Sequence, residues 1–329
     1  MMLVAVAFVA FQAAQSPRFD TDTTVAVPQG SRLRLQNQGG DVTIKTWDRG
    51  QIRIRATHSS RSAVEVDVRG QVVEIEAKGR HGIATAVDYD LTVPTWMALD
   101  VGGMYAEVSI DGTKAPVKVE TLEGNITLRG GAETVTLSTV NGRIRVAGAR
   151  GRIELHAVSE GITVTDVAGG ELVVESVSGD IDLRHIDAKS VDAQTISGEV
   201  IYEGRIVDAG SYSFLTHSGD VTLAISEATN ASLSVVTGNG EVSSSFTLKA
   251  ERTSRRRNTY RMGSGSANVE IETFSGDVEL VRSAELKPAK AESETEDEED
   301  HGRIKVKPKV KGKVPSSDRD DDETGGEVR

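Results

Sequence analysis

The sequence predicts an all-β fold: a parallel, β-helix-like β-solenoid with coils of 18–21 residues, an antiparallel β N-terminal cap and a disordered C-terminal tail. Three observations carry this prediction. One short phrase recurs, as SVSGDI at 176–181, THSGDV at 216–221 and TFSGDV at 273–278. Apolar and polar residues alternate around each copy. The composition, with 33 Gly and 4% aromatic residues, favours short strands and tight turns.

Composition also excludes several classes of function. The chain has 329 residues and a net charge of −12, which argues against nucleic acid because phosphate binding needs a basic surface. It contains no Cys, which rules out disulfides, thiolate metal sites and cysteine nucleophiles. Stability must therefore come from packing.

The first element, residues 1–15, is the uncharged apolar run MMLVAVAFVAFQAAQ, which ends in small residues. We expect a signal peptide cut near Ala14 or Gln15, although no basic residue precedes Arg18. A membrane-spanning helix needs about 20 apolar residues, so we expect no transmembrane span after signal removal. The alternative is a buried N-terminal strand.

Residues 20–95 are predicted to form the N-terminal β cap. The segment LRLQNQGGDVTIK at 33–45 repeats the solenoid pattern around Gly40. The runs QIRIRA, AVEVDV, VVEIEA and VDYDLTVP then alternate like antiparallel strands. Such a cap would cover the first coil, whose open edge otherwise invites aggregation.

Residues 96–283 are predicted to form the solenoid repeats. We take one turn residue in each copy as its anchor, at Gly103, Gly124, Gly142, Glu160, Gly179, Gly198, Gly219, Gly240 and Gly276. Apolar residues recur seven and five positions before the anchor and two and four after it. Each repeat is therefore one coil of two strands, stacked on its neighbour in parallel sheets about 4.8 Å apart.

Two further columns of residues follow from this register. We expect the anchor Gly to supply a positive φ at the bend. Three positions before it stands a small hydroxyl residue, which we expect to form a ladder inside the bend. Its members are Thr121, Thr139, Ser176, Thr195, Thr216, Thr237 and Thr273. In the copy TISGEV at 195–200 we also expect Ile196 to pack at the bend.

The end of the repeat region departs from the pattern. The last anchors are 36 residues apart, and the polar insert at 249–265 is predicted to be a protruding loop. No cap follows the last coil except the charged tail, so coils of different copies could stack end to end. Residues 284–329, with blocks of opposite charge and no aromatic residue, are predicted to be disordered.

Repeats of the type S-G-[DE]-[IV], preceded by a YDLTVP strand, resemble the bacterial putative-adhesin domain family of exported β-solenoid proteins, whose function is unknown. The resemblance covers about residues 30–283. It implies a right-handed parallel β-helix-like fold in an envelope compartment, and it supplies no catalytic residues to carry over.

The sequence indicates no catalytic residues, no cofactor site and no metal site. The histidines form neither HxxxH nor HExxH and do not share one position in the repeat. They are His58, His81, His156, His185, His217 and His301. His217 adjoins Ser218 and Asp220, but we interpret it as a residue of the bend.

The position after the anchor is acidic in four successive repeats, Asp180, Glu199, Asp220 and Glu241. Stacked carboxylates could share Ca²⁺ or meet a cationic partner. We favour the other interpretation, in which they bond the turn backbone and face water.

The run Arg255-Arg256-Arg257, with Arg252, Tyr260 and Arg261, is the sharpest local charge feature. It could dock an anionic glycan, a lipid headgroup or the acidic tail. A solvated loop is the interpretation we prefer.

Together these features predict a non-catalytic binding or structural protein of the cell envelope, exported to the periplasm or the cell surface. Its expected partners are envelope glycans or other envelope proteins, and the oligomeric state is left open. The alternatives are a polysaccharide-active β-helix enzyme and a self-assembling envelope scaffold. The enzyme would need aromatic platforms along one sheet, but both Trp residues, Trp47 and Trp96, lie near the N-terminal part.

Overall fold

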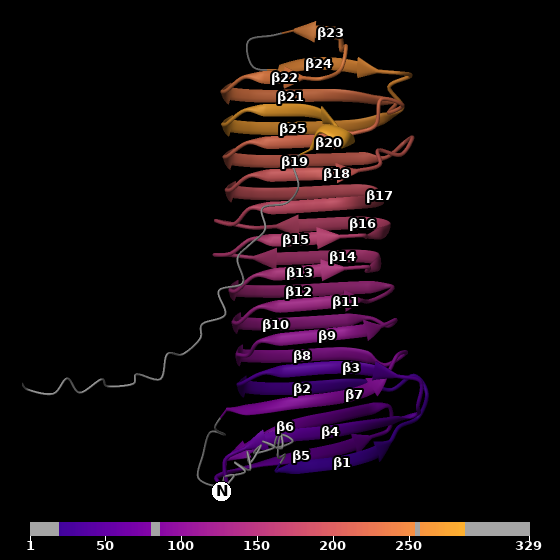
Figure 1. Cartoon of the computed structure of the whole chain (residues 1–329), viewed down its shortest axis with the longest axis vertical. Coiled ribbons are helices and arrows are strands. Elements are labelled where there is room, and N and C mark those ends of the chain that lie inside the picture. The colour runs from indigo at the N-terminus through magenta and orange to yellow at the C-terminus, as the bar shows by residue number, and fades with distance from the viewer. Residues whose placement is uncertain (1–19, 80–85, 254–256, 287–329) are drawn as a thin grey trace, which may run out of the picture. The chain divides into compact units, whose positions relative to one another are not determined.

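The computed structural model describes residues 20–79, 86–253 and 257–286. Apart from one 3-10 turn, η1 (Ser283–Glu285), its regular elements are strands, which coil repeatedly between two sheets (Figure 1). In spatial order the first sheet contains β5 (Ser62–Arg69), β6 (Val72–Gly79), β2 (Arg32–Gly39), β8 (Ala98–Tyr105), β10 (Val117–Glu123), β12 (Thr134–Asn141), β14 (Arg150–Ala157), β16 (Ala168–Glu175), the second half of β17 (Ile181–Ser197), β19 (Ser211–Ser218), β25 (Ala267–Ser275), β21 (Ala231–Asn239), β24 (Arg257–Met262) and β23 (Lys249–Thr253).

The second sheet lies across the core from the first and has shorter strands. In spatial order it contains β1 (Thr21–Ala26), β4 (Gln51–His58), β7 (Val87–Pro94), β3 (Val42–Trp47), β9 (Val108–Thr113), β11 (Ile126–Gly130), β13 (Ile144–Ala147), β15 (Ile162–Thr165), the first half of β17, β18 (Val200–Gly204), β20 (Val221–Ile225), β26 (Val278–Arg282) and β22 (Val242–Ser244).

Alternation along each strand builds the core. In one coil Val117, Val119, Ile126 and Leu128 are buried while the residues between them face outward. The next coil continues each column, because Val117 pairs with Val135 and Ile126 with Ile144 in parallel register. Identical columns therefore run through the stack. The predicted all-β solenoid is confirmed.

The hydroxyl ladder is also confirmed. Inside the bend, the Thr hydroxyl of one coil donates to the anchor carbonyl of the neighbouring coil. Thr195 reaches Gly179 O at 3.1 Å, Thr216 reaches Gly198 O at 3.0 Å and Thr273 reaches Gly219 O at 3.1 Å. These side chains are buried, so each bond gives a partner to a carbonyl at the edge of the core.

The reason given for the anchor glycines was wrong for most of them. Only Gly124 and Gly219, among eight anchor glycines, have a positive φ. The common cause is close approach of backbone. A Cβ would lie 1.9–2.4 Å from the anchor carbonyl oxygen of the neighbouring coil at Gly142, Gly179, Gly198, Gly219, Gly240 and Gly276. Glycine permits coils to stack this closely at the bend.

The N-terminal part is a mixed structure rather than a purely antiparallel one. β1, β4 and β5 pair in antiparallel fashion, as predicted. However, β6 pairs in parallel with β2, and β7 pairs in parallel with β3. The strands β6 and β7 therefore form one further coil, stacked on the coil of β2 and β3. The coil of β2 and β3 thus lies between β6/β7 and β8/β9, although 33–45 precedes both in sequence.

The C-terminal part holds the second departure from chain order. The coil of β25 and β26 lies between β19/β20 and β21/β22 (Figure 1). The insert predicted to be a protruding loop instead contributes β23 and β24, a hairpin that pairs with β21 and covers that edge of the first sheet. An uncapped last coil was therefore a wrong expectation.

Several predicted segments lie outside the described residues. These are the signal peptide at 1–15, His81, Arg255 and Arg256, and all of the tail beyond Leu286, His301 included. Their predicted roles stay predictions.

Candidate binding surface

One line of exposed apolar side chains runs along the bend at the end of the first sheet. Nine large apolar residues are exposed among those described, and six of them stand two residues before the anchor. Met104 joins the same line, because the anchor predicted at Gly103 was wrong: Gly103 pairs with Thr121, and Ala106 takes the anchor place in that coil. Strand pairing stacks these seven side chains coil upon coil. We call them the apolar column: Met104, Leu122, Val140, Val158, Val177, Ile196 and Phe274, with exposed fractions of 36–56%.

The apolar column follows from strand alternation. Positions seven, five and three before the anchor face the core, so position two before it faces outward. Ile196, which sequence reasoning expects to pack at the bend, is instead 53% exposed. His217 occupies the column between Ile196 and Phe274 and stacks on the Phe274 ring, with centroids 4.9 Å apart. The strand alternation in the sequence already places this position on the outer face. An apolar residue that recurs at an outward position is therefore the signal that could have revealed the apolar column.

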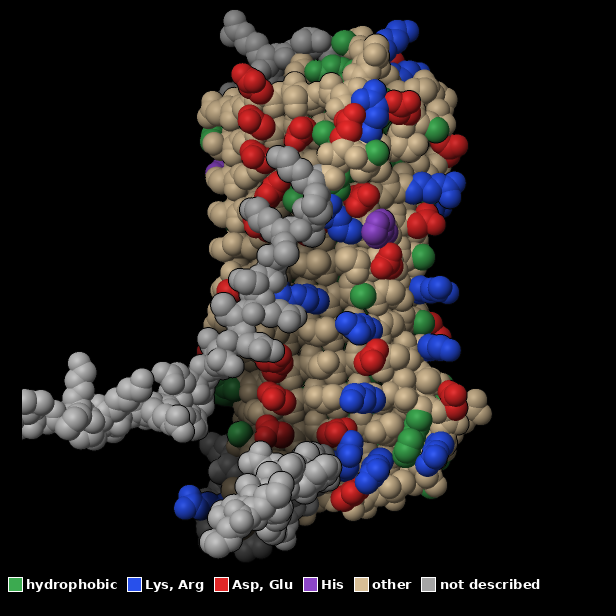
Figure 2. Space-filling view, in the orientation of Figure 1, with side chains coloured by type: hydrophobic (Ala, Val, Ile, Leu, Met, Phe, Trp, Pro, Cys, Tyr) green, Lys and Arg blue, Asp and Glu red, His purple; other side chains and the backbone are tan. Residues whose placement is uncertain are grey.

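A line of carboxylates lies on the other side of the bend, one residue after the anchor. The predicted row of four has a fifth member, because Asp277 lies between Asp220 and Glu241. We call the set the acidic column: Asp180, Glu199, Asp220, Asp277 and Glu241. Figure 2 shows acidic side chains aligned along this edge of the upper coils.

The aspartates of the acidic column bond the backbone of the next coil, as the preferred interpretation predicted. Asp180 Oδ1 accepts from the N–H of Glu199, Asp220 Oδ1 from that of Asp277, and Asp277 Oδ1 from that of Glu241, each at 2.8 Å. One oxygen of each is thus used inside the stack. Asp180, Asp220, Asp277 and Glu241 are exposed, so the column still presents negative charge to solvent.

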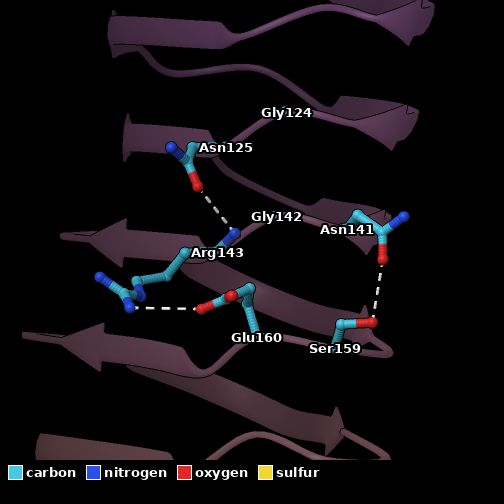
Figure 3. A pocket seen from close by; sticks show the side chains of 7 residues that line it. All are labelled: Gly124, Asn125, Asn141, Gly142, Arg143, Ser159 and Glu160. Carbon is cyan, nitrogen blue, oxygen red and sulfur yellow. Dashed lines mark hydrogen bonds and ion pairs between the residues drawn. The ribbon is translucent and has the colours of Figure 1, made fainter. Parts of the chain in front are cut away.

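The same edge changes character in the coils of β10 to β15, where a hollow of about 400 Å³ opens at the bend (Figure 3). Arg143 stands where the upper coils have a carboxylate, and its guanidinium pairs with Glu160 at 3.3 Å. The Asn125 side chain accepts from the Arg143 N–H at 2.9 Å, and Ser159 donates to Asn141 at 2.9 Å. These groups pair with one another, so the hollow is polar and close to neutral.

The described histidines are dispersed and do not converge on one site. His156 Nδ1 lies 3.1 Å from Glu175, His185 Nδ1 lies 3.3 Å from Asp166, and His58 contacts Thr21 at 3.0 Å. Over residues 20–79, 86–253 and 257–286, no three His, Asp or Glu side chains are grouped so as to hold a metal ion.

The buried tyrosines have structural roles. Tyr202 and Tyr212 meet edge to face in the core, and their hydroxyls donate to Arg205 O at 3.2 Å and Ala188 O at 2.8 Å. Burial raises the pKa of both phenols above the usual value. They therefore stay neutral near neutral pH.

The described part of the arginine run carries ion pairs on β24 and its neighbours. Arg257 pairs with Glu270 at 3.2 Å, Arg261 pairs with Glu251, and Tyr260 packs against the core. These contacts tie the hairpin to the solenoid.

Comparison with known proteins identifies the family. A family profile described as Toastrack DUF4097 matches residues 30–281. The chain belongs to this family. The Toastrack match spans both sheets, from β2 to β26. No curated protein matches the Toastrack chain.

Three solved structures are similar to this Toastrack chain at low identity. A putative cell adhesion protein from Clostridium sporogenes shares 11% identity, with 80% of this chain and 100% of that chain covered and a TM-score of 0.19. Putative adhesins from Parabacteroides merdae and Parabacteroides distasonis share 11% and 13% identity, cover 80% and 79% of this chain and 96% of their own, and give TM-scores of 0.43 and 0.37.

A search for membrane-spanning helices in the described parts of the Toastrack chain found none of sufficient length and hydropathy.

Proposed function

We propose that this Toastrack chain is a non-catalytic, adhesin-like binding protein of the cell envelope, exported to the periplasm or the cell surface. The apolar column carries the proposal. Soluble proteins rarely leave a long contiguous apolar line exposed unless it meets a partner. Seven such side chains in register over successive coils form a surface suited to an extended contact.

Two further features support a binding role in the envelope. The apolar, signal-like start of the sequence suits export. The titratable side chains near the bend pair locally or bond backbone, and they do not face one another across a cleft as the two carboxylates of a glycosidase do.

Co-sedimentation with an isolated envelope fraction tests the proposal. The double variant Ile196→Ser/Phe274→Ser should lose most of the binding, because it removes the most exposed members of the apolar column. Val68→Ser is the matched control, since Val68 is 41% exposed but lies on β5, away from the column. Equal binding by wild type and the double variant would contradict the proposal.

Incubation with neutral and anionic polysaccharides tests the non-catalytic part. We expect no new reducing or unsaturated ends. Their appearance would favour the polysaccharide-active enzyme instead.

A further inference from the structure

In the coils from β16 to β26, which we call the upper coils, the apolar column and the acidic column run side by side. A partner that binds both columns must combine apolar groups with positive charge. From the coil of Asp180 to that of Glu241 the acidic column crosses five coils, about 19 Å at the spacing of parallel strands. Over the same coils the apolar column presents Val177, Ile196 and Phe274, with His217 stacked on Phe274. Only Ser or Asn and the small anchor separate the columns along the chain.

We propose that this double column binds a cationic amphipathic helix of a partner protein, with the helix axis along the stack. The proposal rests on the proposed binding function and names the partner's chemistry. The apolar face of the helix would contact the apolar column, and its Lys or Arg residues would lie beside the acidic column.

Backbone chemistry favours a helix over an extended segment. Within the sheets, strands already pair on both sides, as β19 does with β17 and β25. The bend offers no free strand edge to which an extended partner could add. A helix satisfies its own backbone groups and needs only side-chain contacts.

The dimensions of the two surfaces correspond. A helix of about 13 residues is about 19 Å long, and its turns repeat every 5.4 Å or so. The coils repeat about every 4.8 Å, so each helical turn meets roughly one coil and one carboxylate. Three of the five coils add an apolar residue (Val177, Ile196 and Phe274), and the other two have His217 and Gly238 at that position. The small difference in pitch accumulates to only about 2 Å, which the flexible side chains of Lys and Arg can absorb.

Charge argues against the other occupants. A second copy that docked through the same double column would place carboxylates against carboxylates. Anionic lipids and anionic glycans would meet like charge. Val177 and Ile196 offer aliphatic groups rather than flat rings for sugars to stack upon, and the Phe274 ring is already stacked on His217.

The coils of β10/β11, β12/β13 and β14/β15 supply the contrast. The apolar column continues there through Val140 and Val158, but the position after the anchor is Asn125, Arg143 or Gly161. The hollow in Figure 3 is lined by polar side chains that pair with one another, so these coils have the apolar column without a line of carboxylates beside it. A cationic helix is expected to select the upper coils.

Fluorescence anisotropy with the full-length protein tests the inference. The probe is a labelled 14-residue peptide of Leu and Lys, with Leu at positions i, i+3, i+4 and i+7 so that one face of the helix is apolar. A second peptide has Glu in place of Lys, and a third has the first composition in scrambled order. We expect binding of the first peptide only, and weaker binding as salt concentration rises.

Variants of the protein locate the site. Ile196→Ser should weaken binding of the Lys peptide about five- to tenfold by removing apolar contact. Val140→Ser, in the same column but beside Arg143, should change it less than twofold. Asp220→Asn/Asp277→Asn keeps the side-chain oxygens that accept backbone N–H groups but removes two charges, and should weaken binding at low salt about tenfold. Glu120→Gln, on the outer face of β10, is the matched charge control.

The outcomes separate this inference from the proposed function. Equal affinity for the Lys and Glu peptides, or unchanged affinity of the Asp220→Asn/Asp277→Asn variant, would overturn the cationic helix. A concentration-dependent dimer in sedimentation that Ile196→Ser abolishes would overturn it in favour of a second copy. If the Lys peptide fails to bind while the envelope fraction still binds through Ile196 and Phe274, only this inference fails. If the Ile196→Ser/Phe274→Ser variant also binds the envelope fraction as well as wild type does, the proposed function fails together with this inference.

Discussion

At the scale of single residues, the bend is the most constrained part of each coil. The anchor Gly, the Thr three residues earlier and the Asp one residue later all bond or touch the neighbouring coil. The repeated phrase therefore records contacts between coils. The residue two positions before the anchor points outward, so its side chain is not needed for these contacts between coils. The apolar column consists of residues at this position.

Replacing an anchor glycine should be strongly destabilising. In Gly198→Ala the new methyl group would overlap the carbonyl of Gly179, whose position is fixed by the neighbouring coil. We expect a loss of about 2–3 kcal/mol of unfolding free energy, as for overpacked cores. Urea unfolding measures it. Gly170→Ala is the control, since nothing lies within 4 Å of a Cβ there, and a similar loss in both variants would contradict the argument.

The hydroxyl ladder can be tested by an isosteric change. Thr216→Val removes the donor to Gly198 O and leaves that carbonyl short of a partner. Since Thr216 is buried, we expect a loss of about 1 kcal/mol of unfolding free energy. Thr163→Val on the outer face of β15 should change it by less than half as much. Urea midpoints that fall equally in the two variants would argue against the ladder.

At the scale of elements, the hairpin of β23 and β24 protects the end of the first sheet. Thr259 on β24 pairs with Ser234 of β21 on one side and with Arg252 of β23 on the other. Thr259→Pro should detach the hairpin, because proline removes a donor and disturbs the strand. The exposed edge of β21 should then promote aggregation that light scattering detects at rising concentration. Thr259→Val should stay monomeric, and equal scattering from both variants would refute the protective role.

The edge strand β1 should respond to acid through one ion pair. Arg53 on β4 donates to Asp22 on β1 at 2.8 Å and holds the pKa of that carboxyl below its usual value. A lowered pKa adds stability that is complete above the unfolded pKa of about 3.9 and is lost as pH falls through the folded pKa. Both side chains are exposed, so the effect is small.

The thermal midpoints of wild type and Asp22→Asn should therefore differ slightly at pH 7 and converge as pH falls through the lowered pKa of Asp22. A difference that stays constant from neutral to acid pH would show that the pair does not contribute in this way.

At the scale of the whole molecule, the sequence predicted the coil but not the order of the coils. Alternation decides which side chains face the core, so the columns of Val119, Thr121 and Ile126 could be placed from sequence. The order could not, because every coil offers nearly the same apolar, hydroxyl and Gly columns to its neighbour. Nothing local distinguishes β25 from β21 as the partner of β19.

The candidate surface was also predicted only in part, because the sequence shows the repeat positions but not the order of the coils. The carboxylates at Asp180, Glu199, Asp220 and Glu241 were visible as a row, and the bonds of Asp180 and Asp220 to backbone N–H groups were foreseen. Asp277 was missed as a member because its repeat is distant in sequence. The apolar column was missed because Ile196 was assigned to packing.

The placement of the last coil has a consequence for synthesis. The ribosome releases β21 and β22 before β25 and β26 exist, yet β25 and β26 separate them from β19 and β20 in the finished molecule. If β21 paired with β19 before β25 was synthesised, that pairing would have to break before β25 could insert between them. The last two coils must therefore close together, and only after residue 282 has emerged can this protein complete its fold.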